Sequence, residues 1–270
     1  MAIEVVSIGS SSSGNSYIIS AGKINILLDV GLTARRITGA LQHCGIEPED
    51  IDAVLVTHEH IDHVRSVRAV SRKCPNSVFY ASRGTVQGTE NFKYVPEERL
   101  RLVSGGDSVC IEKAGETALL EVFALSHDAA EPVGFAVTSE GEKLAVVTDT
   151  GIITGEIYDV IRDADMLVFE ANHDEELLMF GDYPYRVKLR IRSDFGHMSN
   201  RYAGEMLAEI LKERPDRPLS LLLAHLSDHN NIPFYASQTI ETALAEAGFS
   251  PGKHYTLDIA AKDELTFFTK

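Results

Sequence analysis

The chain has 270 residues, of which 44% are hydrophobic and 24% charged, proportions typical of a globular protein that buries a core. Its 40 acidic and 25 basic side chains give a formal net charge of −15, which argues against a protein that binds nucleic acid through an overall positive field. The three cysteines have no ligand-like spacing, so we expect free thiols in a reducing cytoplasm. We find no signal peptide or membrane span in the sequence, and we expect a cytoplasmic protein without membrane contact.

Hydrophobic periodicity predicts strands first and then a strand–helix alternation. In the first half we predict strands at 3–8, 16–20 and 24–29, helices at 33–45 and 64–74, and strands at 77–82, 107–112, 118–125, 133–138 and 143–149. In the second half we predict helices at 155–164, 199–215 and 235–248, and strands at 166–172, 219–225, 254–260 and 264–269. Two strand-rich halves, each followed by helices, predict an α/β protein with two packed sheets and outer helices, in a single domain of residues 1–270.

The segment "YRVKLRIRSDFGH" (185–197) places a cation at every second position of an otherwise acidic chain. In an extended strand, Arg186, Lys188, Arg190 and Arg192 would share one face. Such a face either protects a sheet edge or forms a track for an anionic substrate. We favour the track, with Ser199 and Asn200 at the start of the following helix as further phosphate contacts.

The segment "LVTHEHIDH" places three histidines and one aspartate within six residues, directly after an apolar strand. A cation is the ordinary way to accommodate such a cluster. Later in the chain, His127, Asp149, Glu170 and His225 each stand at the end of an apolar run. The ends of strands commonly meet at a shared site. We predict two divalent ions, one held by His58, His60 and His127 and the other by Asp62, His63 and His225, with Asp149 bridging them.

The motifs "THEHIDH", "SH", "TD" and "AH" resemble those of the metallo-β-lactamase fold hydrolases in order and separation, over almost the whole chain. The resemblance implies an αββα sandwich of two mixed β-sheets flanked by helices, in which Asp29 orients the ligand loop. His63 stands where many true β-lactamases carry arginine, and His60 where flavodiiron proteins carry glutamate. The phosphodiesterase side of the superfamily is therefore the nearer match.

Four segments, "GSSSSGNSYII", "FEANHDEELL", "YPYRVKLRI" and "GHMSN", resemble the YycJ/WalJ/VicX group of bacterial proteins. This resemblance implies a two-metal DNA exonuclease of 5′-to-3′ polarity, often with manganese. Zinc or iron would also suit the mixed imidazole and carboxylate ligands. We expect a nucleic acid substrate, which the resemblance to this group implies is DNA, and no obligate protein partner.

Two divalent ions about 3.5–4 Å apart would lower the pKa of a bridging water, which then attacks the phosphodiester. We expect Asp62 to orient this nucleophile and His197 to protonate the leaving oxygen. Glu170 acts with His197, either in catalysis or by orienting the imidazole, and for His173 both a site role and a surface role stay open.

The same residues are also compatible with three functions other than a DNA exonuclease. The first is a small-molecule hydrolase that cleaves a cyclic phosphodiester, a thioester or a lactone. The second is RNA processing like that of tRNase Z. Glu170 and His197 resemble the acidic residue and the extra histidine of that enzyme. The third is a metal-stabilised scaffold without catalysis, which the complete ligand set disfavours.

Overall fold

The computed structural model describes residues 3–270. By its contacts the chain forms two compact units, and each is described by itself. Unit 1 holds the described residues up to 124 together with 129–142 and 261–269, and unit 2 holds 125–128, 143–260 and 270. Among the described residues, no helix is both long and apolar enough to cross a membrane.

Unit 1 is built mainly from short strands. Its strands are β1 (Ile3–Gly9), β2 (Ser16–Ala21), β3 (Ile24–Leu28), β4 (Ile51–Leu55), β5 (Val78–Ala81), β6 (Leu100–Leu102), β7 (Ser108–Lys113), β8 (Glu116–Ala124), β9 (Val133–Ser139) and β14 (Thr266–Phe268). Its helices are α1 (Ala34–His43), α2 (Ile61–Val64), α3 (Val67–Lys73) and α4 (Arg83–Gly88), with the 3₁₀ turns η1 (Pro48–Asp50), η2 (Glu90–Tyr94) and η3 (Glu97–Arg99).

Unit 2 alternates strands and helices. Its strands are β10 (Glu142–Val147, from Lys143 onward in this unit), β11 (Met166–Glu170), β12 (Leu219–Ala224) and β13 (Tyr255–Ile259). Its helices are α5 (Gly155–Ile161), α6 (Glu175–Phe180), α7 (Tyr185–Ile191), α8 (Asn200–Lys212) and α9 (Pro233–Glu246).

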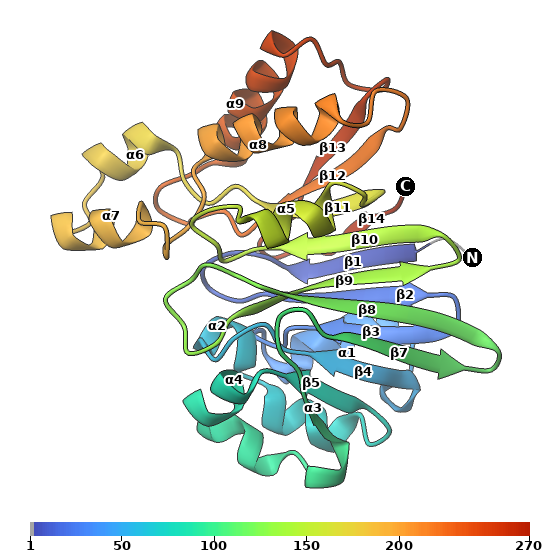
Figure 1. The fold of residues 1–270 in the computed structure, drawn as a ribbon. Coiled ribbons are helices and arrows are strands. Elements are labelled where there is room, and N and C mark those ends of the chain that lie inside the picture. The colour runs from blue at the N-terminus through green and yellow to red at the C-terminus, as the bar shows by residue number, and fades with distance from the viewer. Residues whose placement is uncertain (1–2) are drawn as a thin grey trace. The chain divides into compact units, whose positions relative to one another are not determined.

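The strands form two sheets of seven, in the orders β14-β1-β2-β3-β4-β5-β6 and β13-β12-β11-β10-β9-β8-β7 (Figure 1). In the first sheet β14 to β3 pair antiparallel and β3 to β6 pair parallel. In the second sheet β7 to β9 pair antiparallel and β10 to β13 pair parallel. The expected α/β class, with two mixed sheets flanked by helices, is confirmed.

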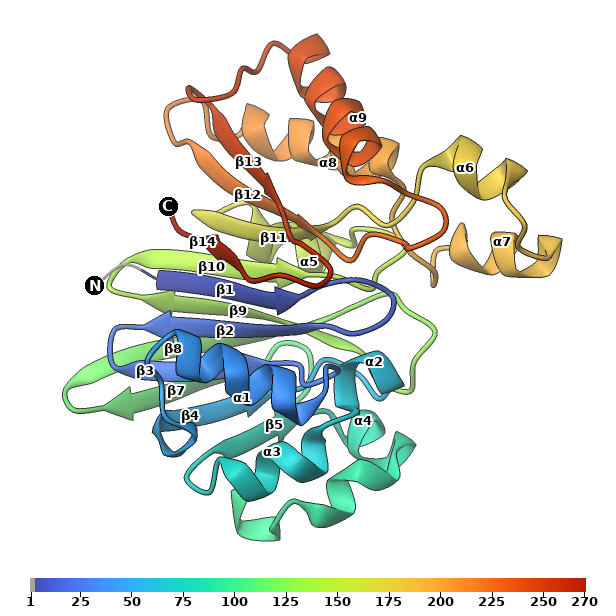
Figure 2. The ribbon, with the colours of Figure 1, turned by 180° about the vertical axis from the view of Figure 1, so that it is seen from behind.

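Burial explains which segments became central strands. Every residue of β11 and β12 is buried, as parallel strands covered on both faces require. In unit 1, α1 lies over the first sheet (Figure 2) and buries Ile37 and Leu41 in the same apolar cluster as Leu27 and Val54. The apolar stripe that the sequence shows on this helix is therefore its sheet-facing side.

The predicted strand at 185–192 is wrong, because residues 185–191 form helix α7. Pro184 stands at the N-cap, and leucine, lysine and arginine favour a helix, so local propensity outweighed the alternating pattern. Successive helical residues are turned by about 100°, so cations two positions apart do not share a face. The predicted cationic strand face therefore does not exist.

Other differences are smaller. The helix expected at 64–74 is α2 and α3, separated at Arg65 and Ser66, and α4, α6 and β6 were not predicted. The remaining predicted strands and helices match observed elements to within a few residues at their ends. Strong apolar periodicity over long segments therefore located the elements correctly.

Candidate metal centre

In unit 1, the predicted ligands His58 and His60 lie in the loop after β4, and Asp62 and His63 lie in the short helix α2 that continues this loop. Two neighbouring segments hold this loop through its backbone. Asn15 N–H donates to Asp62 O at 2.9 Å, and Val30 N–H donates to His63 O at 2.9 Å. Gly31 packs so closely that a Cβ there would lie 1.4 Å from Asp62 O, so only glycine fits.

Asp29 anchors the loop from the end of β3. Its φ of 55° is in the left-handed region, a strained conformation that recurs at functional sites. Its carboxylate accepts hydrogen bonds from Thr57 N–H at 2.9 Å and from His63 Nδ1 at 2.7 Å. Its role in orienting the ligand loop, which the resemblance implied, agrees with these contacts.

Thr57 links the same carboxylate to a second imidazole. Its hydroxyl donates to Asp29 Oδ2 at 3.0 Å and lies 3.0 Å from His58 Nδ1. A hydroxyl has one proton, so with that proton on Asp29 it accepts the Nδ1–H of His58. His58 and His63 therefore keep Nε2 as the nitrogen with a lone pair, the form in which imidazole binds metal.

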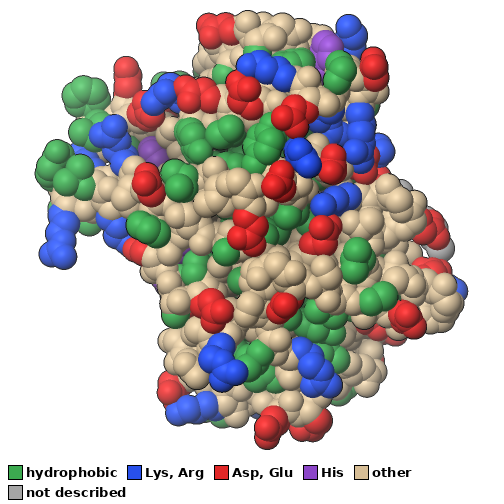
Figure 3. All heavy atoms as spheres, in the orientation of Figure 1, with side chains coloured by type: hydrophobic (Ala, Val, Ile, Leu, Met, Phe, Trp, Pro, Cys, Tyr) green, Lys and Arg blue, Asp and Glu red, His purple; other side chains and the backbone are tan. Residues whose placement is uncertain are grey.

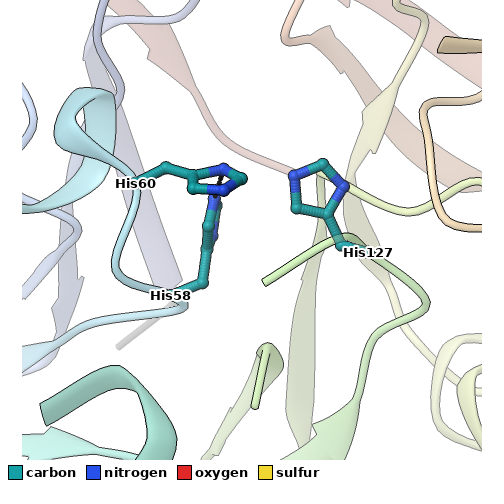
Figure 4. A group of neighbouring side chains, drawn as sticks. All are labelled: His58, His60 and His127. Atoms are coloured by element: carbon teal, nitrogen blue, oxygen red, sulfur yellow. Dashed lines mark hydrogen bonds between the residues drawn. The ribbon is translucent and has the colours of Figure 1, made fainter. Parts of the chain in front are cut away.

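The ligand nitrogens of this loop face one another. His58 Nε2 lies 3.0 Å from His60 Nδ1, with the two rings nearly perpendicular at 80° (Figure 4). His63 Nε2 lies 3.4 Å from Asp62 Oδ2 and 3.2 Å from Asn15 Nδ2. Convergent imidazole nitrogens beside a carboxylate are the donor set of a divalent transition metal.

In unit 2, the predicted residues come from the ends of separate strands and from the loop before α8. Asp149 follows β10 and His225 follows β12, with φ of 60° and 56°. Donor atoms of Asp149, Glu170, His197 and His225 all lie within 4.8 Å of one another. We call these four residues the Glu170 cluster.

Glu170, the last residue of β11, organises this cluster. Its Oε1 accepts from His197 Nδ1 at 2.8 Å and from His225 Nδ1 at 2.9 Å. Its Oε2 accepts from Met198 N–H at 3.1 Å and Thr150 N–H at 3.2 Å. Burial acts to raise the pKa of this fully buried carboxyl, but the two imidazoles outweigh burial and hold the pKa below its ordinary range.

His127 and His225 of unit 2 are held at Nδ1 by a protein acceptor, as His58 and His63 are in unit 1. His225 uses Nδ1 for Glu170 and places Nε2 3.4 Å from Asp149 Oδ1. His127 Nδ1 lies 3.1 Å from Gly196 O, and its Nε2 lies 4.0 Å from Asp149 Oδ1. Burial lowers the pKa of His127, which favours the neutral form that a metal requires.

The contacts of Glu170 favour an orienting role over a direct catalytic one. All four hydrogen bonds hold neighbouring groups in place, and the side chain has no exposed surface. His197, in contrast, is 17% exposed at its side chain and uses only Nδ1 for Glu170. Its Nε2 is the atom that can exchange a proton with a substrate.

The six predicted substrate-binding residues do not form one track. Lys188 is buried, and its Nζ donates to Met179 O at 2.8 Å and to Gly181 O at 2.6 Å, at the end of α6. Arg190 pairs with Asp128, while Arg186 and Arg192 are exposed. Ser199 caps α8 by accepting from Tyr202 N–H at 3.2 Å, and the buried Asn200 bonds to Asn231.

The surface over α6 and α7 combines basic and apolar side chains (Figure 3). Phe180 is 87% exposed, Tyr185 66% and Leu189 48%. These exposed aromatic and apolar side chains therefore lie on the same two helices as the exposed Arg186.

Two residues of the site escaped prediction from the sequence: Thr57, and Asn172, whose Nδ2 donates to His225 O at 2.9 Å. Thr57 directly precedes the predicted ligand His58, and Asn172 follows the predicted site residue Glu170 by two positions. Closeness in sequence to a predicted site residue was therefore the available signal.

Comparison with known proteins decides the family. A model of the β-lactamase superfamily domain matches residues 24–215. The chain is 34% identical over 266 residues to the exodeoxyribonuclease WalJ of Streptococcus pneumoniae, covering 97% of this chain and 96% of that protein. It belongs to the metallo-β-lactamase superfamily and, within it, to the WalJ family.

Two further matches agree with this membership. The exodeoxyribonuclease YycJ of Bacillus anthracis is 34% identical over 251 residues, which cover 93% of this chain and 92% of that protein. The crystal structure of the metallo-β-lactamase fold protein YhfI from Bacillus subtilis superposes with a TM-score of 0.72 at 16% identity, covering 99% of this chain and all of that chain. The expected metallo-β-lactamase fold and the suspected YycJ/WalJ/VicX relationship are confirmed.

Proposed function

We propose that this member of the WalJ family is a metal-dependent nuclease that removes nucleotides from the ends of DNA. The observation that carries the proposal is the shared geometry of the imidazoles. In both units a buried protein acceptor binds Nδ1 and leaves Nε2 to a neighbouring ligand atom. Two full-length relatives that carry the name exodeoxyribonuclease support DNA as the substrate.

The residues fit divalent transition-metal ions, since imidazole nitrogens and carboxylate oxygens together suit manganese, zinc and iron. We propose His58, His60, Asp62, His63, His127, Asp149 and His225 as the ligands of two ions. When bound, such ions activate water and neutralise charge on the phosphodiester.

The protein's own groups complete the chemistry. Asp62 accepts a proton from the attacking water and fixes its direction toward phosphorus. His197, held at Nδ1 by Glu170, delivers a proton from Nε2 to the leaving oxygen. Asp29 and Glu170 keep the imidazoles in their binding tautomers.

The test is digestion of end-labelled single- and double-stranded DNA and RNA by chelated protein reloaded with Mn²⁺ or Zn²⁺. We expect metal-dependent release of nucleotides from DNA, abolished by Asp62→Asn and retained by Asp50→Asn, an exposed aspartate of the same unit. Hydrolysis of bis-p-nitrophenyl phosphate without cleavage of any polymer would instead indicate a small-molecule phosphodiesterase. Preferential cleavage of RNA would indicate processing like that of tRNase Z.

A further inference from the structure

A polar cavity of about 240 Å³ lies within unit 2, and of its lining residues only His197 takes part in the proposed hydrolysis. Its polar lining includes His173, Arg192, His197, Ser199, Arg201 and Tyr202. His197 belongs to both this cavity and the Glu170 cluster. A ligand in this cavity, which we call the His173 pocket, would therefore lie next to the reacting centre.

His173 is the first sign that the pocket takes a ligand. The residue is only 2% exposed, and its Nδ1 has no hydrogen-bond partner among the described residues. Burial, with Arg192 acting in the same direction, lowers its pKa to about 4, so the imidazole is neutral. A buried polar atom without a partner, beside a polar cavity, calls for an explanation, and a ligand supplies one.

The cations around the pocket differ in what they bind. The positive charge of Arg201 is balanced, since this side chain pairs with Glu175 at 3.0 Å and with Glu205 at 2.7 Å. Arg192 forms no ion pair within the described residues, and its recorded contact is with Met179 Sδ at 3.4 Å. Within the described residues, the pocket therefore offers one guanidinium that pairs directly with no carboxylate, although its charge also acts on Glu175.

The start of α8 also favours an anion in the His173 pocket. His173 O accepts from Asn200 N–H at 2.9 Å, which fixes His173 beside the first turn of this 13-residue helix. The positive end of a helix of this length favours an anion. Together with Arg192, the helix start suits a phosphate group.

The two carboxylates of the lining do not oppose this assignment. Glu175 is occupied by Arg201 and by the hydroxyl of Ser199, which donates to it at 3.2 Å. Asp194 is exposed and can accept from a hydroxyl or amino group of the nucleoside that carries the phosphate.

We propose that the His173 pocket binds the terminal phosphate of the polynucleotide end at which hydrolysis begins. The proposal rests on the proposed nuclease function and deepens it, because it states that the accepted end of the polynucleotide carries a phosphate. A phosphate held by Arg192 and the start of α8 places the next diester beside His197. Chains that end in a free hydroxyl lack this anchor.

The experiment compares hydrolysis of otherwise identical oligodeoxynucleotides that carry a phosphate or a hydroxyl at the 5′ end, and likewise at the 3′ end. The metal-loaded wild type is measured beside Arg192→Ala, His173→Asn and the control Arg162→Ala, which changes an exposed arginine elsewhere in unit 2. Thermal unfolding of each variant shows whether it is folded.

We expect the wild type and Arg162→Ala to prefer the phosphorylated form of one end by about 10–100-fold in kcat/KM, as a charge-assisted contact provides. Arg192→Ala should lose most of this preference through a higher KM. Equal rates on phosphorylated and hydroxyl ends by the wild type would overturn the proposal, as would an unchanged preference in folded Arg192→Ala.

A second measurement separates this proposal from the nuclease function. If the wild type hydrolyses bis-p-nitrophenyl phosphate but no polynucleotide, the proposed nuclease function fails. Calorimetric binding of thymidine 5′-monophosphate and of thymidine then tests the pocket alone. Binding that requires the phosphate and is lost in Arg192→Ala supports a phosphate site, whereas equal binding of both compounds, or no effect of the substitution, refutes it.

Discussion

Asp29 in unit 1 and Glu170 in unit 2 are buried carboxylates that each support two histidines, but they do so in different ways. Asp29 binds His63 directly and reaches His58 through the hydroxyl of Thr57. Glu170 binds His197 and His225 directly through one oxygen.

The difference follows from where the histidines come from. The two supported by Asp29 are five residues apart in one loop, so a single neighbouring threonine can relay the contact. The two supported by Glu170 are separated from it by 27 and 55 residues and meet only through the fold. Glu170 therefore joins directly two histidines that come from different parts of the chain, and we expect its loss to be the more damaging.

The largest effect is expected from Glu170→Gln. The substitution keeps the volume but removes the negative charge, and it places an amide NH2 donor against the Met198 and Thr150 N–H groups that donate to Oε2. Loss of one such supporting partner lowers activity by about 10–100-fold, and here two imidazoles lose the charge that orients them, so we expect about 100-fold or more in kcat/KM on labelled DNA. The exposed Glu176→Gln is the matched control. Wild-type activity in Glu170→Gln would contradict the account of this cluster.

A smaller effect is expected from Asp29→Asn, about 10–100-fold in activity and in metal affinity. The Thr57 hydroxyl remains beside His58, so only His63 loses its partner directly. Metal titration followed by activity measures both quantities. An effect larger than that of Glu170→Gln would reverse the comparison between the two carboxylates.

Thr57→Val removes the hydroxyl that links Asp29 to His58. It leaves the Nδ1–H of His58 without an acceptor in a buried position, which costs about 1–3 kcal/mol and should weaken metal binding by about tenfold or more. Thr57→Ser keeps the hydroxyl and should behave as the wild type. Equal losses in the serine and valine variants would show that the relay is unimportant.

The smallest effect on activity is expected from Lys188→Met. This side chain donates to the carbonyls of Met179 and Gly181, so its removal should lower the free energy of unfolding by about 1–3 kcal/mol. Chemical denaturation measures this value, with Lys212→Met as an exposed control. A loss of DNA hydrolysis without loss of stability would restore Lys188 as a substrate contact.

Much of the fold could be predicted because burial and periodicity agree along most of the chain. The strands β12, directly before His225, and β11, which ends at Glu170, are largely apolar runs at the predicted positions, and every residue of both is buried. The prediction for residues 185–192 failed because charges at every second position resemble the pattern of a strand. Pro184 and the local helix propensity instead decided the structure.

For the candidate site, the loop of His58 to His63 was visible because its donors are contiguous. The left-handed conformations of Asp29, Asp149 and His225 could not be predicted, since no pattern in the sequence marks a positive φ at a residue other than glycine. The assignment of ligands to two ions and of Arg186, Lys188, Arg190, Arg192, Ser199 and Asn200 to substrate binding stays a prediction.

The most direct test of the central claim is the metal content of the purified protein, measured by mass spectrometry and compared with its DNA hydrolysis before and after chelation. We predict two divalent transition-metal ions per chain, loss of hydrolysis when they are removed, and recovery on adding Mn²⁺ or Zn²⁺. Full hydrolysis by protein that contains no transition metal would contradict the account.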